Sequence, residues 1–222
     1  MKTQERIMFD VGAHDGHTGI TQLLNDRYDK VYAFEVNPSS LKQIKKRLEN
    51  AISEKPEIKD KYILIEKAVS NFSGKSNFNN FIKSDIGSLL EPNRKEGIGT
   101  VNRVKDFSLV SKKEEEVITL EKFCREEKIT HIDYLHVDTQ GSDLNVLKGL
   151  SDLIEIVKEG RIEAYDPTIQ TCLYENATNT KEECINYLEK YGFHIKGFRP
   201  ADYDIDIFFY KPTTIPTLGF KE

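Results

Sequence analysis

One stretch near the start of the chain limits the fold more than any other, because an apolar run breaks directly into a glycine-rich turn. Residues 7–11 read Ile-Met-Phe-Asp-Val, and residues 12–19 read Gly-Ala-His-Asp-Gly-His-Thr-Gly. A helical pattern follows, and a second apolar run at residues 31–34 stops at Glu35. This order of strand, glycine turn, helix and strand ending in a carboxylate predicts a ligand site at the edge of an open α/β sheet.

The spacing of the glycines indicates which ligand fits this turn. Gly12, Gly16 and Gly19 depart from the G-x-G-x-x-G pattern of dinucleotide-binding turns, because the second glycine comes two residues late. Asp10 lies near the place where a pyrophosphate would bind, and an anion there favours a cationic ligand. S-adenosylmethionine (SAM) carries an ammonium, a sulfonium and a ribose but no phosphate, and Glu35 can accept hydrogen bonds from both ribose hydroxyls. We therefore expect SAM, with a nicotinamide dinucleotide (NAD) or a turn without any ligand as the alternatives.

Composition and charge restrict the remaining function classes. The chain has 222 residues, enough for one domain with a sizeable core, and it carries a net charge of −5 with 31% charged residues. That balance argues against a broad nucleic-acid interface, and no apolar run reaches the roughly 20 residues of a membrane span. The first strand follows residues 1–6 without a signal peptide, which favours a cytoplasmic location. The three cysteines, Cys124, Cys172 and Cys184, form neither a metal-binding spacing nor a disulfide framework.

The rest of the chain alternates between strand and helix patterns. Further strands are predicted at residues 62–66, 76–81, 117–118, 132–137, 161–165, 193–198 and 205–210. Helices are predicted at residues 18–25, 119–128, 144–150 and 181–191. One more helix is predicted to begin at Pro38, with Asn37 as its N-cap. Residues 83–102 contain glycines and a proline with little periodicity, so we interpret them as a lid over the ligand, with a disordered insertion as the alternative. The tail, residues 212–222, is expected to be irregular. Since no second domain is indicated, residues 1–222 are expected to form a single domain.

Several segments, in the same order, resemble those of one enzyme family. Residues 10–16 are similar to the first motif of class I SAM-dependent methyltransferases. Residues 119–123, 133–144 and 146–149 resemble the FkbM-type methyltransferase signature, which runs roughly T-L-D-x-F, I-D-x-x-K-I-D-V-E-G-x-E and V-L-x-G. Residues 31–38, 67–70 and 86–90 are similar to its A-F-E-P-N-P, A-V-S and G-S-S-L segments. The resemblance extends from Ile7 to about Tyr165.

The resemblance implies a single-domain α/β fold of the Rossmann-like class I methyltransferase type. Such a fold has a mostly parallel sheet of about seven strands with an antiparallel C-terminal strand and helices on both faces. It also implies an enzyme that transfers a methyl group from SAM to a hydroxyl of a sugar, a glycan or a natural product. A non-catalytic SAM-binding or interaction module and, less favoured, an NAD-dependent oxidoreductase are the alternatives. The identity of the acceptor and the oligomeric state do not follow from the pattern.

Two positions depart from the family signature around its acidic segment, residues 138–143. Gln140 stands where the family has an acid, so this chain has one charge fewer there. A Gln variant is familiar in the family, so the change does not by itself indicate a loss of activity, but it keeps the alternative of a non-catalytic module open. His136 replaces the usual lysine two residues before Asp138, and strand alternation places these two side chains on the same face.

The residues expected to bind SAM come from the glycine turn, the second strand and the later family segments. Glu35 would hold the ribose hydroxyls, and the turn would pass under the methionine part. Asp10 would orient the ammonium through backbone or water, and Ser88 would close the site from its loop. Ala68 would flank the adenine, as the resemblance implies. The full set is Asp10, Gly12, Ala13, His14, Gly16, Glu35, Val36, Ala68, Ser88 and Asp138.

On the acceptor side, Asp138 is the leading candidate for a catalytic base or a metal ligand, followed by Glu163 and His136. Asp138 and Glu163 come from two strand ends, and if these strands are neighbours the pair could hold Mg²⁺, which would lower the pKa of an acceptor hydroxyl. Structural alternatives are Asp138 as the N-cap of the following helix and His136 as a hydrogen-bonded strand histidine. His14 and His17, in the glycine turn, could also face the acceptor.

Overall fold

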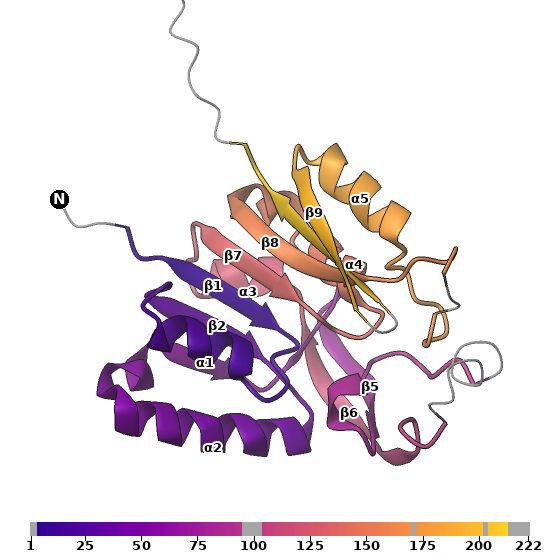
Figure 1. Cartoon of the computed structure of the whole chain (residues 1–222), viewed down its shortest axis with the longest axis horizontal. Coiled ribbons are helices and arrows are strands. Elements are labelled where there is room, and N and C mark those ends of the chain that lie inside the picture. The colour runs from indigo at the N-terminus through magenta and orange to yellow at the C-terminus, as the bar shows by residue number, and fades with distance from the viewer. Residues whose placement is uncertain (1–3, 95–103, 170–171, 202–203, 213–222) are drawn as a thin grey trace, which may run out of the picture.

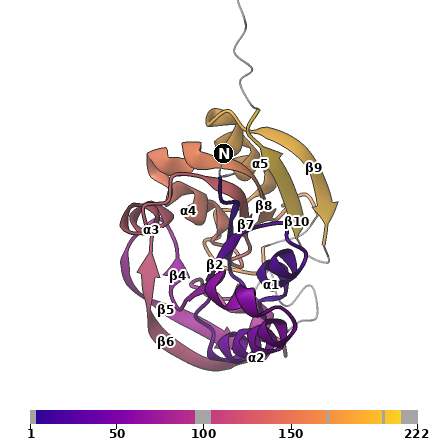
Figure 2. The ribbon, with the colours of Figure 1, turned by 90° about the vertical axis from the view of Figure 1, so that its left-hand side faces the viewer.

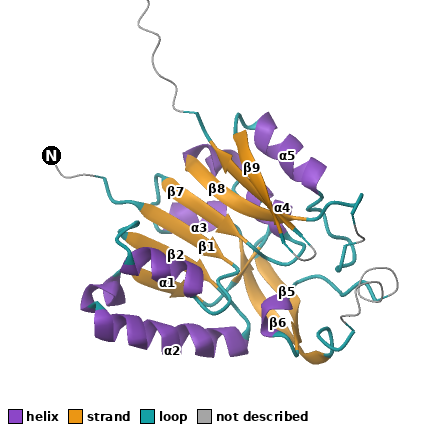
Figure 3. Ribbon diagram, in the orientation of Figure 1, coloured by secondary structure: helices purple, strands orange, loops and turns teal. Residues whose placement is uncertain are grey.

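The computed structural model describes residues 4–94, 104–169, 172–201 and 204–212. Its centre is a seven-stranded sheet with the strand order β3-β2-β1-β7-β8-β10-β9 (Figures 1 and 3). The strands are β1 Ile7–Val11, β2 Lys30–Phe34, β3 Tyr62–Ile65, β7 Ile132–Val137, β8 Val157–Ala164, β9 His194–Pro200 and β10 Ile205–Tyr210. Neighbours from β3 to β8 pair in parallel, whereas β10 is antiparallel to both β8 and β9. The predicted α/β sheet, mostly parallel with an antiparallel C-terminal strand, is confirmed.

The order of the strands reverses direction at the centre of the sheet. From β1 the chain adds β2 and β3 on one side, and it then returns to place β7 on the other side of β1. The carboxyl ends of β1 and β7 therefore form the topological switch point, where the crossover connections diverge and leave a crevice for ligands.

Helices cover both faces of this sheet (Figure 2). They are α1 His17–Leu24, α2 Pro38–Glu54, α3 Leu120–Glu126, α4 Asp143–Lys148 and α5 Lys181–Lys190, with short 3₁₀ helices η1 Pro56–Asp60, η2 Ser84–Ile86 and η3 Ser151–Ile156. Alternation along β1 separates two cores, because Met8 joins the buried cluster of α1 and α2, whereas Phe9 joins the larger cluster of α3, α4 and α5. Asn37 caps α2 by accepting a hydrogen bond from the N–H of Ser39, as predicted. Among the residues described, no helix combines the length and the apolar character needed to cross a membrane.

A second sheet of three strands lies beside the carboxyl edge of the first (Figure 1). Its strands are β4 Ala68–Val69, β5 Gly74–Phe81 and β6 Leu109–Ile118, in the order β4-β6-β5. The charged residues 112–116 are part of β6. In the expected lid, Ser88 pairs with Asn79 of β5 in a short antiparallel bridge, which attaches this part of the segment to the small sheet. Residues 95–102 of the expected lid and 213–222 of the expected tail lie outside the described residues.

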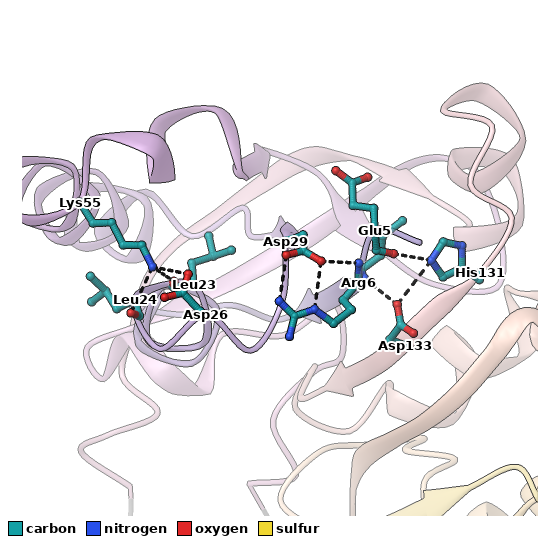
Figure 4. A network of polar contacts seen from close by, with 10 residues as sticks. Glu5, Arg6, Leu23, Leu24, Asp26, Asp29, Lys55, His131 and Asp133 are labelled. Carbon is teal, nitrogen blue, oxygen red and sulfur yellow. Dashed lines mark hydrogen bonds and ion pairs between the residues drawn. The ribbon is translucent and has the colours of Figure 1, made fainter. Parts of the chain in front are cut away.

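The amino edge of the large sheet is ordered by polar contacts between strand starts (Figure 4). The Arg6 guanidinium binds the Asp29 carboxylate at 2.9 Å, which ties the start of β1 to the start of β2. The N–H of Ile7 donates to Asp133 of β7 at 2.7 Å, and His131 Nε2 donates to the carbonyl oxygen of Glu5 at 2.7 Å. These contacts connect the amino ends of β1, β2 and β7, and they do not involve the carboxyl edge of the sheet.

A chain of polar side chains crosses the sheet on the face that α1 covers. Asp10 of β1 is fully buried and accepts hydrogen bonds from the Gly19 N–H of α1 at 3.0 Å and from His136 Nδ1 of β7 at 2.6 Å. His136 Nε2 contacts the Arg161 guanidinium of β8, which lies 3.4 Å from Asp206 of β10. Because a guanidinium can only donate, Nε2 is the acceptor and the ring proton lies on Nδ1, facing Asp10. The chain fixes α1 and four strands relative to one another.

This polar chain gives a stability prediction. Asp10→Ala should lower the free energy of unfolding by about 3–5 kcal/mol, because it leaves the Gly19 N–H and His136 Nδ1 without partners in a buried site. Asp29→Ala is the matched control, since it removes a carboxylate from an exposed ion pair and should cost far less. Urea unfolding of both variants measures the difference, and equal losses would contradict the role given to Asp10.

Candidate functional site

A cavity of about 280 Å³ lies at the switch point, between the carboxyl edge of the large sheet and the small sheet. Six of the predicted site residues line it: Gly12, His14, Glu35, Val36, Ala68 and Asp138. Its walls also include residues that the sequence did not single out for the site, among them Lys67, Phe78, Asp85 and Thr139. The small sheet and the η2 segment therefore close a site that the large sheet opens.

The glycine turn touches the ends of two neighbouring strands through its backbone. The N–H groups of Gly12 and Ala13 both donate to the carbonyl oxygen of Phe34 at the end of β2, at 3.1 and 3.0 Å. Gly12 has φ +80°, and a Cβ added there would lie 1.8 Å from the carbonyl oxygen of Asp138. Only glycine allows this approach, which brings β1, β2 and β7 to the same cavity.

Other residues of the turn have packing roles rather than places in the cavity wall. Gly16 caps α1 at φ +74°, and a Cβ there would crowd Ile20, Ile44 and the Tyr62 hydroxyl. Ala13 is buried in the core of α1 and α2. The expectation that Gly16 and Ala13 pass under the ligand therefore has no support in the cavity lining, which includes Gly12 instead.

Glu35 presents a buried carboxylate at the end of β2. Its Oε1 accepts hydrogen bonds from the N–H groups of Val36 and Asn37 at 2.8 and 2.7 Å, and its Oε2 accepts one from the N–H of His14 at 2.8 Å. Burial raises the pKa of Glu35 to about 7, although the three N–H donors act in the opposite direction. An ionised carboxylate has about four acceptor positions, so Glu35 keeps capacity for a ligand hydroxyl.

His14 is held in an uncommon backbone conformation on the cavity wall. Its φ is +48°, a region that non-glycine residues rarely adopt, and its N–H bond to Glu35 maintains it there. Its Nε2 lies 3.2 Å from the Ser84 hydroxyl of η2, so the turn meets the small-sheet segment at this point. His17 lies outside the cavity lining and contacts Arg47 of α2.

The loop between β7 and α4 is held in place by hydrogen bonds to Asp143, the first residue of α4. The buried Asp143 carboxylate accepts hydrogen bonds from the N–H groups of Thr139 and Gly141 at 2.7 and 3.1 Å and from Asn179 Nδ2 at 3.0 Å. Burial, with the charge of Asp138 as the next cause, raises the pKa of Asp143 to about 7. The N-cap of α4 is Ser142, so Asp138 does not cap this helix and its side chain remains in the cavity wall.

Glu163 and Ser88 approach the cavity without lining it, and both contact Gln140. The Gln140 Nε2 donates to Asp138 Oδ1 at 2.8 Å and to Glu163 Oε2 at 3.1 Å, and the Ser88 hydroxyl donates to the Gln140 carbonyl oxygen at 2.8 Å. Burial and, next, the charge of Asp138 raise the pKa of Glu163 well above its usual range. Tyr174, whose hydroxyl lies 2.8 Å from Gln140 Oε1, completes the group and carried no signal in the sequence.

Two further predicted site residues, one acid and one histidine, lie away from the cavity. Asp10 and His136 are both buried in the polar chain on the α1 face, and neither lines the cavity. The two nitrogens of His136 are occupied by Asp10 and Arg161, which explains why the ring cannot reach an acceptor. The structural alternative of a hydrogen-bonded strand histidine therefore describes His136 better than the role of a base.

The expectation of Mg²⁺ between Asp138 and Glu163 has no support in the geometry. Among the residues that the structure describes, no group of three or more His, Cys, Asp or Glu side chains could hold a metal ion. The donor group of the Gln140 amide lies between the two carboxylates instead.

Comparison with known proteins identifies a protein family whose model matches this chain. The model of one protein family, described as the methyltransferase FkbM domain, matches residues 10–195. No curated protein matches the sequence. An FkbM methyltransferase structure from Methylobacillus flagellatus is similar, with a TM-score of 0.60 and 15% identity over 93% of this chain and 44% of the other.

Two further solved structures share the fold at low sequence identity. TrmK from M. capricolum, in complex with S-adenosylhomocysteine (SAH), has a TM-score of 0.50 and 13% identity, over 93% of this chain and 62% of the other. A member of an O-methyltransferase family from Burkholderia thailandensis has a TM-score of 0.50 and 10% identity, over 95% of this chain and 52% of the other. The chain thus spans between two fifths and two thirds of the length of these structures.

The buried Glu35 gives a prediction for the pH dependence of stability. Its pKa of about 7 exceeds the ordinary value of 4.5, so the folded protein keeps a proton that the unfolded chain releases. The stabilising effect is full below about pH 4.5 and is lost as the pH rises through about 7, a fall of about 3 kcal/mol in the free energy of unfolding.

Glu35→Gln should remove this part of the pH dependence, whereas the part due to Asp143 remains. Urea unfolding between about pH 5 and 8 measures both profiles, with exposed Glu49→Gln of α2 as the matched control. Parallel profiles for the wild type and Glu35→Gln would show that Glu35 is ionised throughout.

Proposed function

The chain belongs to the FkbM methyltransferase family, and we propose that it transfers the methyl group of SAM to a hydroxyl oxygen of a sugar, glycan or natural-product acceptor. The observation that carries the proposal is the buried Glu35 carboxylate, which ends β2 within the cavity at the switch point of the sheet. In this position the remaining acceptor capacity of a carboxylate suits a ribose hydroxyl.

The charges of the cavity favour SAM over a dinucleotide. Its wall contains the acids Glu35, Asp85 and Asp138 but a single lysine or arginine, Lys67. Acidic side chains stabilise an ammonium and a sulfonium, whereas they repel the pyrophosphate of NAD. The described lining contains no arginine, and the glycine turn lacks the G-x-G-x-x-G spacing that lets a pyrophosphate approach the backbone.

The apolar part of the same wall suits the adenine. Val36 follows β2, Ala68 begins β4, and Phe78 and Leu89 come from the small sheet and the segment after it. Val36, Ala68 and Phe78 form one buried cluster with Val117, and the partly buried Leu89 packs against it. We therefore place the adenine against this cluster, the ribose at Glu35 and the methionine part along Gly12, with the segment around Ser84–Ile86 as the cover.

Asp138 is the residue proposed to act on the acceptor. Methyl transfer is an in-line displacement in which the acceptor oxygen attacks the methyl carbon while the bond from carbon to sulfur breaks. The acceptor hydroxyl must release one proton, and Asp138, on the cavity wall at the end of β7, is placed to receive it. Alignment of the two substrates contributes the larger part of the rate.

Removal of the Glu35 carboxylate tests the cofactor assignment. Glu35→Ala should weaken SAH binding by about 2–4 kcal/mol, or at least about 30-fold, because hydrogen bonds to a charged group are lost. Glu49→Ala, at an exposed position of α2, should leave SAH binding unchanged. Isothermal titration measures both, and an unchanged affinity in Glu35→Ala would exclude the proposed contact with the ribose.

Transfer of a labelled methyl group from SAM to a panel of hydroxylated sugars tests the reaction itself. Asp138→Asn should lower kcat by about 100-fold or more with little change in SAH affinity, because the amide keeps the shape but accepts no proton. Asp152→Asn, exposed in η3, is the control. SAH binding without turnover on any acceptor would favour the alternative of a SAM-binding module, and full activity of Asp138→Asn would contradict its role as the base.

A further inference from the structure

Gln140 lies where two carboxylates converge at the acceptor end of the cavity. Its Nε2 is 2.8 Å from Asp138 Oδ1 and 3.1 Å from Glu163 Oε2, so one amide group contacts both acids. The two acids come from the end of β7 and from β8, which are adjacent parallel strands. Carboxylate oxygens are ligands that Mg²⁺ and Ca²⁺ take in proteins, so two converging carboxylates could provide part of a divalent-cation site.

The orientation of this amide is set from its other end. The Tyr174 hydroxyl has one hydrogen, which it shares between Gln140 Oε1 at 2.8 Å and the carbonyl oxygen of Ile86 at 2.9 Å. Carboxylate oxygens accept, so the amide turns its NH₂ end toward Asp138. The Gln140 backbone is also fixed, with φ +56° and its carbonyl oxygen bound by the Ser88 hydroxyl. Oε1 therefore faces Tyr174, and the two N–H bonds of Nε2 point to the carboxylates.

This arrangement excludes a cation from the gap for a physical reason. The amide hydrogens carry partial positive charge and occupy the carboxylate lone pairs that a cation would need. A Mg²⁺ ion requires oxygen ligands at about 2.1 Å in near-octahedral geometry, whereas Nε2 places a nitrogen donor between the two acids. The amide also satisfies both carboxylates without adding a third negative charge to a partly buried site.

We propose that the Gln140 amide takes the place of a divalent cation between Asp138 and Glu163 and positions Asp138 for the acceptor without a metal ion. Gln140 is thus a positioning residue, which acts through Asp138 rather than on the substrate. The effect of Gln140 on methyl transfer rests on the proposed function, whereas the exclusion of cations by its amide does not depend on that function. The raised pKa of Glu163 agrees with this arrangement, since burial and the nearby Asp138 favour a single negative charge on the pair.

The test converts the amide into a third acid and measures cation binding directly. Mg²⁺ and Mn²⁺ are titrated against the full chain, with the melting temperature and isothermal titration as readouts, for the wild type and Gln140→Glu. Gln140→Glu should gain a cation site, and a cation at about ten times its dissociation constant should raise its Tm by about 3–6 °C. The wild type should show no such rise. Gln22→Glu, the same chemical change on α1 outside the cavity lining, should behave as the wild type.

Each contrary result has a definite meaning. A rise in the wild-type Tm with Mg²⁺ or Mn²⁺ that disappears in Asp138→Asn would overturn the proposal, because the cation would then bind beside the amide. A folded Gln140→Glu variant without any cation response would also overturn it. If Gln140→Glu does not fold, Gln140→Ala replaces it: the emptied gap should admit a cation, and no response would count against the proposal.

The same experiment separates this inference from the proposed function. SAH titrated into the same samples reports the cofactor site, because the readouts for cations and for SAH are independent. SAH binding in all variants with cation binding in the wild type would contradict the role of Gln140 alone. A cation response confined to Gln140→Glu without SAH binding in the wild type would contradict the methyltransferase proposal alone.

Discussion

The backbone contact between Gly12 and the carbonyl oxygen of Asp138 is the constraint on which the site depends. A Cβ at residue 12 would lie 1.8 Å from that oxygen, so any other residue would separate the glycine turn from the end of β7. Because the same turn is hydrogen-bonded to Phe34 at the end of β2, one contact sets the relative positions of three strand ends. Glu35 and Asp138 share one cavity for this reason, and the small sheet closes a site whose floor is already defined.

The hydrogen-bond partners of the buried acids distinguish those that order the fold from those that face the cavity. Asp10 and Asp143 accept hydrogen bonds from backbone N–H groups or neighbouring side chains on all sides, and they order α1 and the loop after β7. Three backbone N–H groups hold Glu35 while it faces the cavity, where we propose that it also binds the cofactor. Within the described residues, Asp138 has Gln140 as its side-chain partner, and it lines the cavity in which we propose that the acceptor binds.

Features that are local in sequence could be predicted, whereas those that join distant segments could not. The glycine turn, the place of Glu35, the cap at Asn37 and the succession of strands and helices along the chain follow from short patterns, because chain geometry fixes them within a few residues. The burial of His136 depends on Asp10, which is 126 residues away, and on Arg161 of the next strand. The Gln140 bridge depends likewise on Glu163 and Tyr174. The small sheet escaped recognition because the long connection between β5 and β6 concealed their pairing.

We propose that the cavity at the switch point binds an adenosyl sulfonium cofactor rather than a phosphate-bearing dinucleotide. Isothermal titration of the wild-type chain with SAH, SAM and NAD tests it most directly, with the three ligands compared in one buffer. We expect dissociation constants of about micromolar order for SAH and SAM and no measurable heat for NAD. Binding of NAD in preference to SAH, or no binding of either adenosyl ligand, would contradict it.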